Sequence, residues 1–149
     1  MTTGPIHIVD QFDDRSAWDA FVEAHPYGHF FQCWTWGEMQ RGLAATPRRI
    51  AAVSGGAIRG AVQMLVFEGA TRRFAVVPRG PVVDPGDVDA VRALSTVLVE
   101  AGRAERASLV RVEPQWDWSE PSVALLESSG FRSAKQWIMP RRTMLVDLR

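Results

Sequence analysis

The chain has 149 residues, with a hydrophobic fraction of 46% and a charged fraction of 23%, values that are ordinary for one globular domain. Its 17 Lys and Arg balance its 17 Asp and Glu, so no net charge favours non-specific binding to nucleic acid or to an anionic membrane. Cys33 is the only cysteine, which excludes an internal disulfide and argues against a cysteine metal site. Neither a signal peptide nor an apolar run long enough to span a bilayer is visible, which predicts a cytoplasmic protein without a transmembrane segment.

The first third of the chain predicts one short strand and two helices. Ile6 to Val9 have the pattern of a strand, and a helical apolar face follows as far as His25-Pro26. That helix is expected to end there, because the residue before a proline is disfavoured in the α region. A second helix is predicted from Thr35 to Leu43, with Trp36, Met39 and Leu43 on its apolar face.

Three strands joined by short turns come next. Arg49 to Val53, Ala57 to Phe67 and Arg73 to Val77 are separated by the glycine turns at residues 55–56 and 69–71. The short connections predict an antiparallel meander. Pro78 and Pro81 then interrupt the sheet, because proline cannot donate a hydrogen bond to a ladder.

The last part of the chain predicts a helical crossover and a return to the sheet. A long helix from Val88 to Glu105 precedes a strand from Leu109 to Val112, which is therefore expected to be parallel to a neighbour and buried on both faces. A short helix from Pro121 to Ser129 follows. Two further strands, Phe131 to Trp137 and Thr143 to Leu148, are predicted to complete the sheet.

This order of elements predicts an α/β (α+β) fold in one domain, residues 1–149, with a mixed, mostly antiparallel sheet flanked by helices. It is similar to the order in the GNAT-like acyl-CoA N-acyltransferase fold. Enzymes of that fold that use acyl-CoA hold its pyrophosphate on backbone N–H groups at the start of a helix. In the corresponding loop here, residues 78–87, prolines remove donors and aspartates repel a pyrophosphate. We therefore expect no acyl-CoA and no other cofactor.

A series of short motifs points to a narrower family. In chain order they are Phe30-Phe31-Gln32, Trp36-Gly37, Gly60-Ala61 with Gln63, Pro78-Arg79-Gly80-Pro81, Arg111-Val112-Glu113-Pro114, Gly130-Phe131, Pro140-Arg141-Arg142-Thr143 and Val146-Asp147-Leu148. Together they resemble the N-terminal GNAT-like subdomain of the Fem family of bacterial peptidoglycan interpeptide-bridge aminoacyltransferases (peptidyltransferases). The motifs cover nearly the whole chain, from about Trp18 to Leu148.

The resemblance implies an activity and its partners. Fem proteins have two GNAT-like subdomains in tandem and transfer an amino acid from aminoacyl-tRNA to an amine on the stem peptide of a peptidoglycan precursor. That precursor is a UDP-linked muropeptide or its lipid-linked form. The sequence matches only the first subdomain, so the tRNA-binding part is expected in a missing second half, a partner chain or a homodimer.

The candidate substrate-binding residues come from the resemblance and from strand ends. The segment after the first motif contributes to the acceptor site in the family, which makes Trp34, Gln40 and Arg41 candidates. Arg79 lies at a strand end, where a guanidinium can clamp a diphosphate or a peptide carboxylate. An ion pair of Arg79 with Asp84 or Glu113 is an equally good interpretation.

Two further candidate sites follow the predicted crossover. Arg111 and Glu113 alternate on one strand and therefore face the same side, which favours a structural ion pair and leaves Glu113 as the one weak candidate for a general base. Trp116 and Trp118 alternate in the next loop and are candidates for contact with a ligand or a partner surface.

The other chemically active side chains favour structural roles. Phe31 and Trp36 are expected to pin the second helix to the sheet, although the aromatic cluster around them also suits a wall of a precursor cleft. The histidines lack metal-ligand spacing, so capping is the better interpretation and no metal site is expected. Cys33 is predicted to be a buried, inert thiol.

Two other functions stay open from sequence. One is a stand-alone GNAT N-acyltransferase that uses acyl-CoA and a small amine. The other is a non-catalytic module that dimerises through Trp116, Trp118 and Trp137.

Overall fold

A mixed sheet forms the centre of the computed structural model, which describes residues 4–136, 138–140 and 146–148. The strands found in this part of the chain are β1 (His7–Asp10), β2 (Ala45–Ser54), β3 (Ala57–Glu68), β4 (Arg73–Val77), β5 (Val82–Val83) and β6 (Ala107–Val112). Their spatial order is β1-β2-β3-β4-β6, with β5 paired to β3. All pairs are antiparallel except β4 with β6. The predicted meander and the parallel strand after the crossover are confirmed.

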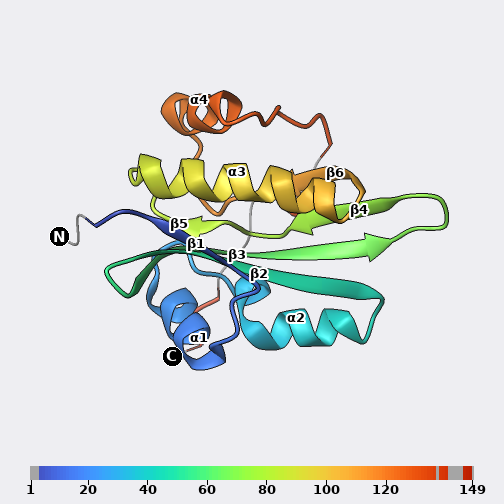
Figure 1. Cartoon of the computed structure of the whole chain (residues 1–149), viewed down its shortest axis with the longest axis horizontal. Helices are drawn as coiled ribbons and strands as arrows, with labels where there is room; N and C mark the ends of the chain where they lie inside the picture. Colours follow the sequence, from blue (N-terminus) through green and yellow to red (C-terminus); the bar gives the residue numbers. More distant parts are fainter. Residues whose placement is uncertain (1–3, 137, 141–145, 149) are drawn as a thin grey trace.

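Helices cover both faces of this sheet (Figure 1). On one face are α1 (Arg15–Ala24), the short 3-10 helix η1 (Phe30–Gln32) and α2 (Trp34–Arg41). On the other face α3 (Val88–Ala104) packs against the sheet, and α4 (Glu120–Ser128) lies beyond it. Carboxylates of Asp14 and Asp87 cap the first turns of α1 and α3, which places these helix starts where the sequence predicts them. None of the described helices is long and apolar enough to cross a membrane.

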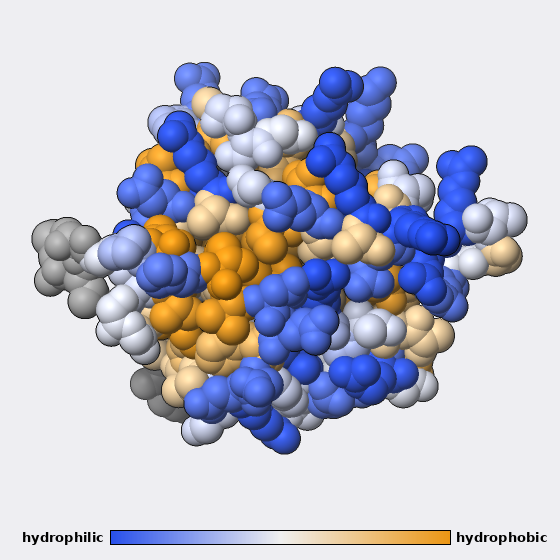
Figure 2. Space-filling view, viewed as in Figure 1, coloured by the Kyte–Doolittle hydropathy of each residue, from blue (hydrophilic) through white to orange (hydrophobic). Residues whose placement is uncertain are grey.

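The sheet divides the apolar core into two clusters. The larger cluster joins α3 to the strands and includes Leu94, Leu98, Ile50 and Met64, all fully or almost fully buried. The smaller cluster surrounds Trp18 of α1 on the opposite face. Both faces of β2 and β3 are therefore covered, which explains their nearly continuous burial. On the face seen in Figure 2, an apolar area lies between α3 and α1, and hydrophilic side chains cover much of the rest.

A bulge separates β4 from β5. Leu65 of β3 pairs with Val76, and Ala61 of β3 pairs with Val82. Between these pairs, residues 62–64 of β3 face the longer segment 77–81, so the second strand carries two extra residues. The bulge contains the prolines that were expected to interrupt the sheet.

Three predictions about elements are wrong. Strand β6 is not buried on both faces, because it lies at the edge of the described sheet and Leu109 is 51% exposed. The described residues 131–136 and 146–148 form no strand, while Trp137 and residues 143–145 lie outside the described part of the chain. The helix predicted as far as Leu43 ends at Arg41, so Leu43 lies outside α2 and is 66% exposed.

Candidate functional site

The candidate site lies where β4 and β6 separate. The Glu113 amide donates to the Val77 carbonyl at 3.2 Å, just beyond the last paired residues of the two strands. Farther on, Trp116 Nε1 donates to the Val83 carbonyl at 2.9 Å. The bulge 78–81 therefore opens beside the end of β6. Sheet ends of this kind are common ligand-binding places in α/β folds.

Arg79 stands in the bulge with a left-handed backbone, φ +51°. Its Nη2 donates to the Pro140 carbonyl at 2.8 Å. Its Nε is buried and has no hydrogen-bond partner among the described residues. In that part of the chain neither Asp84 nor Glu113 forms an ion pair with Arg79, so the predicted structural alternative is not found. One buried guanidinium N–H is left for another group.

Arg111 and Glu113 form the predicted pair on one side of β6 and its end. Arg111 Nη1 lies 3.6 Å from Glu113 Oε1 and also donates to the Gln136 carbonyl at 2.5 Å. Glu113 Oε1 accepts the Ile138 amide at 3.3 Å, whereas Oε2 is buried and unpaired within the described residues. The structural ion pair is confirmed. The carboxylate nevertheless keeps one acceptor for a ligand.

An aromatic cluster adjoins Arg79. Phe31 lies 4.4 Å from Trp36 and 4.8 Å from His29, measured between ring centroids, and Phe30 packs on all three rings. Burial lowers the pKa of His29, and the positive charge of Arg79 lowers it further. Phe30 is 58% exposed. Trp36 Nε1 is buried without a partner among the described residues.

Polar contacts hold α2 on the sheet. Arg49 of β2 is 6% exposed, and its guanidinium lies 3.7 Å from the centroid of the Trp34 ring. It donates to Gln63 Oε1 at 2.9 Å, to the Trp34 carbonyl at 3.0 Å and to Glu38 Oε1 at 2.9 Å. The hydrogen bond from Arg49 is the largest cause of the lowered pKa of Glu38. The Phe31–Trp36 contact joins α2 to η1, and Arg49 joins α2 to β2, a link not predicted from the sequence.

The remaining predicted residues do not join Arg79. Trp34 is held under Arg49, and Gln40 is half-buried on α2. Arg41 is exposed and pairs with Glu38 of the same helix at 3.2 Å. Trp116 turns inward against the core, whereas Trp118 is 77% exposed. Of the sequence candidates, Arg111 and Glu113 contact each other, and Arg79 lies in the bulge that begins after Val77, the residue whose carbonyl accepts the Glu113 amide.

The start of α3 is occupied by the chain's own carboxylates. Asp87 accepts the Ala90 amide at 3.2 Å and is held by two hydrogen bonds from Arg59, at 2.7 and 2.8 Å. Asp84 accepts the Gly86 amide at 2.8 Å. Carboxylates of the chain therefore accept N–H groups at this helix start, the kind of place where enzymes of this fold bind the pyrophosphate of acyl-CoA.

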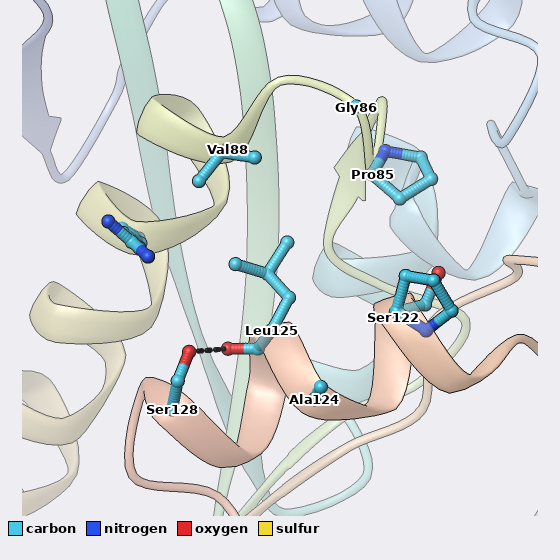
Figure 3. A pocket seen from close by; sticks show the side chains of 9 residues that line it. Pro85, Gly86, Val88, Ser122, Ala124, Leu125 and Ser128 are labelled. Atoms are coloured by element: carbon cyan, nitrogen blue, oxygen red, sulfur yellow. Dashed lines mark hydrogen bonds between the residues drawn. The ribbon is translucent and has the colours of Figure 1, made fainter.

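A shallow groove of about 590 Å³ lies between α3 and α4, away from Arg79. Leu125 points into it toward Val88, and the Pro85-Gly86 loop closes one end (Figure 3). Its lining is mostly apolar, with Arg92 as its cation. No cluster of three His, Cys, Asp or Glu side chains suited to a metal occurs in the described residues. His25 and His29 instead accept backbone N–H groups, the capping role predicted for histidine.

Sequence comparison decides the family. The model of the FemAB family matches residues 14–138, most of the chain. The chain belongs to the FemAB family. Curated relatives of this family member include a lipid II:glycine glycyltransferase of Staphylococcus aureus (strain bovine RF122 / ET3-1), 30% identical over 96% of the chain. The chain spans only 35% of that relative, about a third of its length.

Solved structures agree with the family and with the fold. A structure described as the crystal structure of FemX matches 83% of this FemAB chain and 32% of its own, with a TM-score of 0.76 and 27% identity. An acetyltransferase of Trypanosoma brucei matches 97% of the chain and 100% of its own, with a TM-score of 0.59 and 22% identity. The second likeness shows the fold alone, and it confirms the predicted GNAT-like architecture.

Proposed function

We propose that this FemAB-family chain supplies the precursor-binding half of an aminoacyltransferase that builds peptidoglycan interpeptide bridges. Its relatives named lipid II:glycine glycyltransferase support this reaction class. The observation that carries the proposal is a set of three buried polar atoms without partners in the described residues: Trp36 Nε1, Arg79 Nε and Glu113 Oε2. Arg79 lies in the bulge, and Glu113 directly follows β6, the strand that pairs with β4. A buried polar atom left unpaired costs free energy unless a ligand or water satisfies it.

The chemistry of these groups suits a nucleotide-linked muropeptide. The Arg79 guanidinium can donate to a diphosphate or a peptide carboxylate. The exposed face of Phe30 can stack on a uracil or sugar ring. Glu113 Oε2 can accept a hydrogen bond from the amine of the stem peptide. Arg111 Nη1 lies 3.6 Å from Glu113 Oε1 and holds the carboxylate in place, which leaves Oε2 as the oxygen that can meet the amine.

The transfer needs little more than correct placement of two reactants. The amine nitrogen attacks the ester carbonyl carbon of aminoacyl-tRNA, a C–N bond forms and the ester C–O bond breaks. The amine loses a proton, and the released ribose hydroxyl takes one up. Holding the reactants together accounts for much of such an acceleration. We assign the aminoacyl-tRNA site to a second subdomain, a partner chain or a second copy, since this chain spans about a third of its relatives.

Calorimetric titration with UDP-N-acetylmuramoyl-pentapeptide tests the proposal. We expect saturable binding, and an Arg79→Ala variant should weaken it by about tenfold, the loss of one charge-assisted hydrogen bond. Arg92→Ala, which removes the guanidinium from the groove between α3 and α4, should leave the affinity unchanged. No binding by the folded chain, or micromolar binding of acetyl-CoA instead, would overturn the proposal.

A further inference from the structure

The bulge leaves a gap in the hydrogen-bond ladder of β3. Continued pairing from Leu65–Val76 would place Gln63 opposite Pro78, but the extra residues carry the second strand away before β5 resumes pairing at Val82. Gln63 is fully buried. Its backbone N–H and carbonyl on that side therefore need partners from elsewhere.

The side chain of Gln32 fills this gap. Its Oε1 accepts the Gln63 amide at 2.7 Å, and its Nε2 donates to the Gln63 carbonyl at 3.3 Å. The same Nε2 donates to the Pro78 carbonyl at 2.7 Å. Gln32 is itself fully buried at the end of η1, and its carbonyl accepts Trp18 Nε1 at 2.7 Å. The Gln32 side-chain amide thus forms the two hydrogen bonds with Gln63 that a paired strand would form. The same amide also binds the Pro78 carbonyl in the bulge.

Close packing makes this contact specific. A Cβ atom at Gly80 would lie 2.7 to 2.9 Å from the side-chain amide atoms of Gln32, so the loop rests directly on the amide. Arg79 stands between Pro78, which Gln32 holds, and Gly80, which packs on it. Its left-handed φ of +51° is uncommon for a residue with a side chain and persists only where the surroundings impose it. Gln32 contacts the residues on both sides of Arg79.

We infer that Gln32 is a positioning residue that aims the Arg79 guanidinium at the anionic group of the precursor. The inference rests on the proposed function, because Arg79 has a ligand only if that function holds. Glutamine suits the role since its amide offers two donors and an acceptor. An ionised glutamate offers no donor to Pro78 or to the Gln63 carbonyl, and a methionine of similar size offers none either.

A double-mutant cycle tests the inference, with the affinity for UDP-N-acetylmuramoyl-pentapeptide as the readout. Gln32→Met should weaken binding by roughly fivefold when Arg79 is present and by less than about twofold in the Arg79→Ala background, because interacting positions are not additive. Gln32→Glu should behave in the same way. Gly80→Ala disturbs the contact with Gln32 from the loop side. If the Gln32 variants do not fold, this variant replaces them in the double-mutant cycle with Arg79→Ala.

Ser54→Ala is the matched control. Ser54 is fully buried and donates to the Gly4 carbonyl at 2.8 Å, so this variant also loses a buried hydrogen bond, but outside the bulge. Its thermal stability should fall while its affinity stays unchanged. Equal losses on Gln32→Met with and without Arg79, or no loss at all, would overturn the inference. An Arg79→Ala variant with full affinity would instead contradict the proposed function.

Discussion

Two histidine rings serve as backbone caps near the candidate site. His25 Nδ1 accepts the Tyr27 amide at 3.1 Å, and His29 Nδ1 accepts the Phe31 amide at 3.2 Å. A ring nitrogen can accept only while it is unprotonated. Burial lowers the pKa of both histidines; Arg79 lowers that of His29 further, whereas Asp84 opposes the shift at His25. The folded protein therefore favours the neutral rings.

These caps predict a loss of stability in mild acid. The folded-state pKa values lie below the unfolded value of about 6.5, so the unfolded chain binds more protons as the pH falls from 6.5. The free energy of unfolding should therefore decrease between pH 7 and pH 5. Asn can accept the same N–H without titrating, so the double variant His25→Asn/His29→Asn should show a flatter curve.

Urea unfolding at several pH values measures this effect. Asp10 and Glu38 also have lowered pKa values, but they titrate below their ordinary values of 3.8 and 4.5, outside the window. The wild-type chain and the double variant would have equal slopes between pH 7 and pH 5 if the caps did not titrate, and that result would refute the prediction.

Removal of the unpaired indole N–H of Trp36 should change precursor binding but not the stability of the fold. Phenylalanine keeps the packing on Phe31 but removes a buried donor that has no partner among the described residues. Trp36→Phe should leave the free energy of unfolding unchanged within about 1 kcal/mol. Precursor affinity should fall several-fold if that donor meets the ligand. Thermal unfolding and calorimetry measure the two quantities, and a loss of stability without a loss of affinity would contradict the prediction.

The separation along the sequence of the residues in each contact explains which site contacts the sequence predicts. The Arg111–Glu113 pair follows from strand alternation, a local pattern, and it is confirmed. Gln32 and Gln63 occur in the family motifs, but their hydrogen bonds join positions 31 and 46 residues apart. The contact of Arg79 with Pro140 joins positions 61 residues apart. The periodicity of a single sequence does not predict contacts between residues so far apart.

At the scale of elements, the packing of α2 shows how polar groups decide which face turns inward. Met39 of α2 stays exposed, while the buried Gly37 faces the sheet. A Cβ atom at Gly37 would lie 2.2 Å from Gln63 Oε1 and 2.5 Å from Arg49 Nη2. Apolar periodicity does not predict this face, because the buried Arg49 takes two of its partners, the Trp34 carbonyl and Glu38, from α2.

This close approach predicts opposite effects at Gly37 of α2 and at Gly42, the residue that follows the helix. Gly37→Ala should destabilise the fold by roughly 1 to 3 kcal/mol, because α2 must move away from the buried Arg49 and Gln63. Gly42 is the matched control: it has a helical φ of −70°, and an added Cβ would come no closer than 3.4 Å to the Met39 carbonyl. Gly42→Ala should stabilise by about 0.5 kcal/mol, since alanine restricts the unfolded chain. Chemical denaturation measures both, and equal values would refute the packing argument.

At the scale of the whole molecule, the order of elements is largely predictable because its signals are local. Asp14 and Asp87 cap helices, and prolines and glycines end strands within a few residues of the expected places. The predicted strand at residues 131–136 fails for a different reason. A strand exists only when a neighbour pairs with it, and pairing is a long-range property that β propensity alone does not supply.

The charge of the whole molecule leads to a prediction about RNA. Lys and Arg balance Asp and Glu, and many described arginines are already neutralised within the fold. The ion pairs are Arg15 with Asp19, Arg41 with Glu38, Arg48 with Asp10 and Glu105, Arg49 with Glu38, Arg59 with Asp87, Arg73 with Glu68 and Glu105, and Arg111 with Glu113. Affinity for a polyanion grows with the number of free cations that meet phosphates. Arginines held in ion pairs on the described surface are therefore less available to the phosphates of a tRNA.

We expect the chain to bind UDP-N-acetylmuramoyl-pentapeptide at least about tenfold more tightly than tRNA at physiological ionic strength. Calorimetry gives the first affinity, and an electrophoretic mobility shift over a range of salt concentrations gives the second. The arginine-rich composition alone would suggest the reverse order, but arginines held in ion pairs release few counterions on binding. Micromolar, strongly salt-dependent tRNA binding would place the aminoacyl-tRNA site on this half and refute the proposed division of labour.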